Sequence, residues 1–238
     1  MKKSIYTFFL TASVIAYSGI NGLTCEGNET IQSTERKRIS HASVNSLLTK
    51  YVTDEGVVNY KGFKTEHNKL KTYITFLETH SPEVNWSKNE KLAYWINLYN
   101  SLTIDLLLDN YPIASITKIE GKDYTLNEIE NKIIRPIFNE PRIHFAVNCG
   151  AKSCPKLLNE AFTGDKLEAQ LQKQTIAFIN NSIENQLTTS SAQISKIFEW
   201  YAADFGEIVP FLNKYSDIKV KLNAKISYSE YNWQLNGK

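Results

Sequence analysis

The segment SKNEKLAYWINLYNSLTIDLLLD, residues 87–109, decides the fold because it specifies a long helix. Ser87 and Glu90 match a capping box, in which a hydroxyl and a carboxylate bind the free backbone N–H groups at a helix start. Apolar residues then recur at intervals of three and four, and Pro112 closes the segment. The pattern predicts a mostly buried helix that runs to about Asp109 and forms the centre of the domain.

Two further helices and three short strands are indicated outside this segment. Residues 125–128 repeat the capping pattern ahead of an isoleucine-rich stretch that Pro136 kinks or ends. Residues 165–168 repeat it before a helical periodicity that reaches Ile179. The fold class that follows is α+β, a helix-rich single domain with a small β-sheet. The β-type runs that predict strands lie at 142–147, 219–222 and 225–228.

The N-terminus has the pattern of a secretory signal peptide. Lys2 and Lys3 form a short positive region, and the run from Ile5 to Ile20 is apolar and uncharged. This run is shorter than the roughly 20 residues that span a bilayer, so cleavage is favoured over a permanent membrane helix. We therefore expect residues 1–25 to be a targeting segment and the mature protein to be exported.

Two processing routes follow from residues 22–25. Gly-Leu-Thr-Cys loosely resembles a lipobox, which predicts a lipidated Cys25 and contact with the membrane only through that lipid. Ordinary cleavage between residues 16 and 22 is the alternative. Residues 26–43 are polar and predict a flexible tether, which leaves 44–238 as a single globular domain. The expected location is the periplasm, free or as an outer-membrane-anchored lipoprotein.

The composition narrows the range of partners. The formal net charge is +2 with both signs interspersed, so nucleic acid is not an expected partner. The 13 Tyr, 11 Phe and 4 Trp either supply core volume or line a cleft. We expect an envelope peptide or a small molecule as ligand or substrate, with no cofactor and no metal.

The segment 141–155, PRIHFAVNCGAKSCP, combines a histidine with a cysteine five residues later, His144 and Cys149. A thiol becomes a good nucleophile once ionised, and an imidazole or free backbone N–H groups lower its pKa. Gly150 permits a tight turn, after which residues 151–153 can present N–H groups to a thiolate or an oxyanion. In a strand, the odd separation would place His144 and Cys149 on opposite faces, so their pairing requires a bend around Cys149. The segment predicts a Cys149 nucleophile with His144 as its base.

Three alternatives use the same cysteines. Cys149 and Cys154 are an even pair once Cys25 is set aside, and exported proteins fold in oxidising surroundings, which favours a disulfide. A redox dithiol fits less well because the spacing is C-x4-C rather than C-x-x-C. A metal site lacks a fourth ligand at usable spacing. The nucleophile and the disulfide stay open as competing hypotheses.

Several motifs, in order along the chain from about Val44 to the end, resemble those of one family. They are 56–60 (GVVNY), 94–104 (YWINLYNSLTI), 126–130 (LNEIE) with Arg135, 141–149 (PRIHFAVNC), 153–155 (SCP), 198–201 (FEWY) with 204–205 (DF), and 231–236 (YNWQLN). On these motifs the chain is similar to the family catalogued as domain of unknown function 547, as an exported bacterial member. The resemblance implies a domain and points to residues without naming a substrate. A papain-like fold would suit Cys149 and His144 by analogy.

The resemblance draws attention to two amides in an apolar setting. Asn97 and Asn100 lie one turn apart on the predicted central helix, where an unpaired buried amide costs about 1 to 3 kcal/mol. They therefore need partners. Either they bind the backbone of a loop, or they orient His144 or a substrate carbonyl.

Charged residues in the same motifs offer further orienting groups. Glu130 with Arg135, and Asp204, are candidates for orienting a catalytic group, or else they form structural ion pairs. Arg142 offers two parallel donors to a substrate carboxylate, or else it forms a salt bridge.

The sequence supports two hypotheses of function. In the first, the protein is an exported thiol-dependent hydrolase or acyl-transfer enzyme that acts on an amide or peptide bond, with Cys149 as nucleophile and His144 as base. In the second, it is a non-catalytic envelope module that binds a ligand or partner. Aromatic and asparagine side chains then line a groove, and Cys149 and Cys154 form a disulfide.

Overall fold

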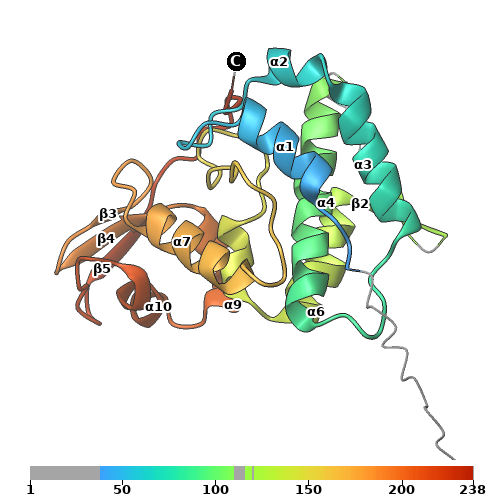
Figure 1. Ribbon diagram of the computed structural model, residues 1–238. Helices are drawn as coiled ribbons and strands as arrows, with labels where there is room; N and C mark the ends of the chain where they lie inside the picture. Colours follow the sequence, from blue (N-terminus) through green and yellow to red (C-terminus); the bar gives the residue numbers. More distant parts are fainter. Residues whose placement is uncertain (1–37, 110–115, 120, 238) are drawn as a thin grey trace, which may run out of the picture. The chain divides into compact units, whose positions relative to one another are not determined.

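The computed structural model describes residues 38–109, 116–119 and 121–237 (Figure 1). Ile39–Lys238 forms one compact unit, which begins a few residues before the predicted boundary at 44. The predicted signal peptide, residues 1–25, and most of the predicted tether, residues 26–43, lie outside the described residues.

The unit has the predicted α+β fold, rich in helices, with a two-stranded and a three-stranded sheet among the described residues. The strands are β1 (Ile116–Ile119) and β2 (Lys122–Thr125), which form a hairpin, and β3 (Gln186–Leu187), β4 (Ser191–Ile194) and β5 (Lys225–Tyr228). The helices are α1 (Ala42–Tyr51), α2 (Tyr60–Lys64), α3 (His67–Thr79), α4 (Lys88–Leu108), α5 (Leu126–Glu128), the π-helical turn η1 (Ile129–Ile134), α6 (Arg135–Phe138), the 3-10 turn η2 (Pro141–Phe145), α7 (Leu167–Ile179), α8 (Ile197–Trp200), α9 (Ala202–Phe205) and α10 (Ile208–Tyr215).

Helix α4 confirms the predicted central helix. The Ser87 hydroxyl accepts a hydrogen bond from the N–H of Glu90 (3.2 Å), and the Glu90 carboxylate accepts one from the N–H of Ser87 (2.8 Å). The helix ends at Leu108, with Asp109 as its C-cap. Helices α3 and α4 pack together and α1 packs on α3, so the three lie side by side (Figure 1). Their apolar faces form the first hydrophobic cluster of the domain.

A second hydrophobic cluster forms around the three-stranded sheet, in which β4 lies between an antiparallel β3 and a parallel β5. It includes residues of α7, α8 and α10, and Phe145 of η2 packs in it against Phe178, with ring centroids 5.1 Å apart. Ile143 belongs to the first cluster. The turn η2 therefore lies where the two clusters meet, with His144 between them.

The predicted strand at 142–147 is wrong, because Pro141–Phe145 forms the turn η2. Pro141 suits the first position of a helical turn, and the Glu140 carboxylate accepts a hydrogen bond from the N–H of Arg142 (3.1 Å). Residues 143–147 are all buried. Their β-type composition thus reflects burial in the core and not pairing in a β-sheet. Because the segment is not a strand, the argument that His144 and Cys149 lie on opposite faces does not apply.

Of the two other predicted strands, one is confirmed and one is wrong. Residues 225–228 are confirmed as β5. The predicted strand at 219–222 is wrong: this segment is a loop in which the Asn213 side chain binds both the N–H and the C=O of Val220, each at 2.8 Å. The Asn213 side chain thus makes the hydrogen bonds to Val220 that a neighbouring strand would otherwise make.

The other two predicted helices are present, but their ends differ from the prediction. Thr125 and Glu128 form the predicted capping box, and the helical stretch continues through η1 and α6 to Phe138, shortly after Pro136. Helix α7 reaches Ile179, as predicted. It begins at Leu167 with Lys166 as its N-cap and no side-chain cap, so the predicted capping box at 165–168 does not start it.

The C-terminal segment, residues 231–237, returns to the N-terminal half of the domain (Figure 1). Gly237 pairs with Val58, and Leu235 pairs with Ala151. A Cβ on Gly237 would lie 2.1 Å from the carbonyl oxygen of Val58, so this approach needs a glycine. The last residues therefore lie against the loop that carries the two cysteines. Among the described residues, each helix is too short or too polar to cross a bilayer.

Candidate functional site

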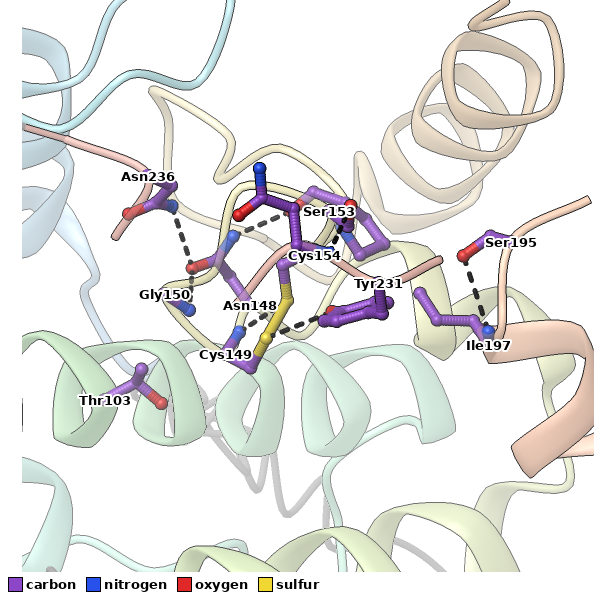
Figure 2. The surroundings of a disulfide bond; sticks show 12 residues. Thr103, Asn148, Cys149, Gly150, Ser153, Cys154, Ser195, Ile197, Tyr231 and Asn236 are labelled. Atoms are coloured by element: carbon purple, nitrogen blue, oxygen red, sulfur yellow. Dashed lines mark hydrogen bonds between the residues drawn. A yellow bond between two sulfur atoms is a disulfide. The ribbon is translucent and has the colours of Figure 1, made fainter. Parts of the chain in front are cut away.

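Cys149 and Cys154 are joined by a disulfide, with Cα atoms 6.1 Å apart (Figure 2). The Tyr231 hydroxyl lies 3.3 Å from Sγ of Cys149. Gly150 has a φ of +82°, and a Cβ there would approach Cδ1 of Leu107 to 2.6 Å. The turn after Cys149 therefore requires the glycine that the sequence supplies.

Two of the backbone N–H groups that the sequence offered to an oxyanion are already bound. The N–H of Lys152 donates to the carbonyl of Gln234 (2.7 Å), and the N–H of Ser153 donates to the carbonyl of Asn232 (3.2 Å). The cysteine loop is thus hydrogen-bonded to the C-terminal segment. While that segment is in place, these two donors do not face a substrate.

His144 is buried, with 3% of its surface exposed. Its Nε2 lies 2.7 Å from a carboxylate oxygen of Asp204, and its ring stacks on Tyr201 with centroids 4.0 Å apart. Burial lowers the pKa of His144 to about 4, although Asp204 opposes that shift. The imidazole is therefore neutral at pH 7.

Asp204 is itself fixed by Arg135. The guanidinium donates from Nε and Nη2 to the two carboxylate oxygens, at 2.6 and 2.9 Å, and from Nη1 to Asn131. This bidentate pair lowers the pKa of Asp204. Asp204, which the sequence offered as an orienting group, thus lies at His144, and α9 is the element that brings it there.

A pocket of about 140 Å³ lies beside the disulfide. Its walls come from α4, η1, η2, the cysteine loop, α8 and the C-terminal segment. The predicted residues Cys149, His144 and Glu130 all line it. The other lining residues are Tyr99, Val147, Cys154, Pro155, Ile197, Trp200, Tyr201, Tyr231 and Trp233.

Three of the predicted site residues lie outside this pocket lining. Asn97 binds both the N–H and the C=O of Phe162, at 2.9 and 2.7 Å. Asn100 donates to the carbonyl of Ala146 (3.0 Å) and accepts from the N–H of Asn148 (2.9 Å). Both amides thus hold loop backbone, which is the first of the two roles considered for them.

Arg142 is the third of these residues. It forms two-point contacts with Glu140 and with Glu168, at 2.6 to 2.8 Å. These carboxylates raise the pKa of Arg142, so the guanidinium stays charged and paired. The salt bridge considered for Arg142 is the role it takes here.

The hypothesis of a binding module expected aromatic side chains to line a groove, but it named none of them as site residues. Trp200, Tyr231 and Trp233 pack on one another, with ring centroids 4.6 to 5.8 Å apart. Trp200 is 46% exposed and Trp233 68% exposed. The motifs at 198–201 and 231–236 contain all three rings, so the signal was present, but pattern alone does not bring two such distant segments together.

A larger cavity, of about 590 Å³, shares Cys154 and Pro155 with the pocket. Lys152, Lys156 and Glu184 are among its lining residues. Burial raises the pKa of Glu184. This cavity contains neither His144 nor Glu130, so the predicted chemistry gathers in the smaller pocket.

One group of side chains has the composition of a metal site in the described part of the chain. Ligand atoms of His67, Asp105 and Asp109 all lie within 4.8 Å of one another. Lys71 already pairs with Asp109 at 2.8 Å, and Nε2 of His67 lies 2.6 Å from Asp105. Each of the three side chains therefore already has a polar partner, and none of them lines the pocket.

The fold and site define an α+β domain with a disulfide beside an aromatic pocket. A family model described as "Protein of unknown function, DUF547" matches residues 84–179, a range that includes α4, η2, both cysteines and α7. The match supports the resemblance seen in the motifs between 94 and 155. No curated protein and no solved structure matches the chain.

Proposed function

We propose that the protein is a non-catalytic module of the cell envelope that binds a small ligand or the side chain of a partner in the pocket beside the disulfide. The observation that carries the proposal is the bond between Cys149 and Cys154. A disulfide-bonded sulfur is not a thiolate, so Cys149 cannot attack a carbonyl while this bond is intact.

The pocket has the composition of a binding site. It combines apolar and aromatic walls with a few polar groups, namely the Glu130 carboxylate, the His144 imidazole and the hydroxyls of Tyr99, Tyr201 and Tyr231. Its position where the two hydrophobic clusters meet keeps those groups on well-packed elements. The envelope location rests on the N-terminal pattern of residues 1–25.

A ligand-observed NMR screen of small fragments tests the proposal, with the full mature chain kept non-reducing. Fragments are expected to bind the wild type and to bind Trp233→Ala at least several-fold more weakly, because that ring forms one wall. Leu222→Ala, which shortens another exposed apolar side chain, is the matched control and should retain binding. Hits that bind wild type and Trp233→Ala equally would contradict a ligand site in this pocket.

A second function is favoured by the placement of His144 between Asp204 and the pocket that Cys149 also lines. After reduction of the disulfide by a dithiol, the Cys149 thiol would pass its proton to His144 and attack an amide carbonyl. The amine would leave with that proton, and water would hydrolyse the thioester. This is the thiol-dependent hydrolase that the sequence suggested.

The variant Cys154→Ser separates the two functions because it frees Cys149 without a reductant. The hydrolase proposal expects rapid alkylation of Cys149 at pH 6 to 7 and cleavage of amide substrates by this variant. The double variant with Cys149→Ser should be inactive in both assays. Slow alkylation, at the rate of a model thiol, together with no cleavage would leave the binding function alone.

A further inference from the structure

The charge of the pocket comes from one residue. Glu130 is 7% exposed, and it is the one carboxylate among the described residues that line the pocket, which include neither lysine nor arginine. The hydroxyl of Tyr99 lies 3.3 Å from its Oε2, and the hydroxyl of Tyr201 also binds it. Both partners are neutral donors, so they solvate the carboxylate without balancing its charge.

The hydrogen bonds of the Arg135 guanidinium go to other residues, although Glu130, after Asp204, helps to raise the pKa of Arg135. It forms a two-point ion pair with Asp204, and its third nitrogen binds Asn131. Its charge is balanced by Asp204, and the neutral His144 adds none. Asp204 and Glu130 carry two negative charges against the one positive charge of Arg135, so the pocket and its immediate support keep one net negative charge.

Aromatic rings line the same pocket as this carboxylate. Trp200 and Trp233 are exposed lining residues and Tyr231 packs against both, whereas Tyr201 has His144 stacked on it and Arg135 over its ring, 4.9 Å from the centroid. Aromatic faces attract cations through their quadrupole, and they do so more strongly beside a carboxylate and away from water. The lining thus favours a positive group with an apolar surface.

We infer that the pocket receives the head group of an organic cation, an alkylated ammonium, with Glu130 as its counter-ion. This names the ligand class of the proposed binding function and rests on it. The volume of about 140 Å³ suits a head group and not a whole peptide, since sites for drug-sized ligands occupy about 300 to 1,000 Å³. The rest of the ligand extends past the exposed rings of Trp200 and Trp233.

A pair of isosteric probes tests the charge directly. Choline and 3,3-dimethylbutan-1-ol have the same shape, but the alcohol has carbon in place of the charged nitrogen. Each is titrated against the full mature chain by calorimetry at one ionic strength. Choline is expected to bind at least about tenfold more tightly than the alcohol.

Variants then assign the preference to Glu130. Glu130→Gln keeps an oxygen for Tyr99 and should reduce the preference for choline to less than about threefold, with alcohol binding unchanged. Glu199→Gln removes an exposed carboxylate on the same side of the domain, outside the pocket lining, and should keep the preference. Circular dichroism verifies that each variant is folded.

The outcomes distinguish the ligand class from the binding function. Equal affinity of the two probes, or a preference for choline that survives in Glu130→Gln, would overturn the cation inference. Binding of neither probe would overturn it as well. In each of these cases the fragment screen decides separately whether the pocket binds ligands at all.

Discussion

Two buried histidines lie in different regions of the domain and differ in what surrounds them. His41, at the N-cap of α1, contacts the Tyr73 hydroxyl of α3 through Nδ1 (2.6 Å), within the helical core. His144, in η2, contacts the carboxylate of Asp204 and lines the pocket. Burial lowers the pKa of both to about 4. A shifted pKa alone therefore does not mark a functional histidine, and what distinguishes His144 from His41 is its carboxylate partner and its place in the pocket lining.

The largest expected effect comes from removing Asp204. Asp204→Ala leaves Arg135 and His144 without their shared partner, and we expect the free energy of unfolding to fall by about 3 kcal/mol. Urea denaturation measures the change. Glu199→Ala, at an exposed ion pair with Lys196, is the control and should cost about 1 kcal/mol or less. Equal losses in the two variants would show that the His144 region is no better fixed than the surface.

The pH dependence of stability should reveal both histidines. Because their pKa values are lower in the folded than in the unfolded state, the unfolded chain takes up protons first as the pH falls below about 6.5. Between pH 7.5 and pH 5 each histidine is expected to cost about 2 kcal/mol of stability. Urea unfolding across this range measures the loss.

Single variants separate the contributions of the two histidines to this pH dependence of stability. His41→Gln and His144→Gln should each flatten the loss of stability on acidification, because each removes one group that must stay neutral. His80→Gln, at an exposed histidine, is the control. If only one of these two variants reduced the loss of stability on acidification, the two histidines would differ in protonation as well as in their surroundings.

The smallest effect should come from the hydroxyl at His41. Tyr73→Phe removes one buried hydrogen bond and is expected to lower the free energy of unfolding by about 1 kcal/mol. Fragment binding to the pocket should be unchanged, because Tyr73 lies in the helical core. Weakened binding in this variant would mean that the two regions are coupled.

The helices were predictable because their signals are local. The capping box of Ser87 and Glu90 and the periodicity behind it lie within one segment, and α4 follows them closely. The prediction of a strand at 142–147 was wrong because an apolar run indicates that residues are buried but does not indicate their backbone conformation. There, Pro141 and the Asn100 amide select a turn, and Asn100 is distant in sequence.

The site was predictable only in part for a related reason. Cys149, His144 and Glu130 were named from motifs within the range that the family model matches. The ion pair between Asp204 and Arg135 and the walls formed by Trp200 and Trp233 depend on segments brought together by the tertiary fold. Residue type made Asp204 and Arg135 candidates, but only the packing of the two clusters brought them and the tryptophans to their partners.

The state of the two cysteines is the most direct test of the account. The protein, produced with residues 1–25 in place and kept non-reducing, is denatured in iodoacetamide and digested with trypsin, which cleaves after Arg142, Lys152 and Lys156. Mass spectrometry should find IHFAVNCGAK linked to SCPK, with neither cysteine alkylated. Two separate peptides, each carrying an alkylated cysteine, would contradict the disulfide and return Cys149 to the role of nucleophile.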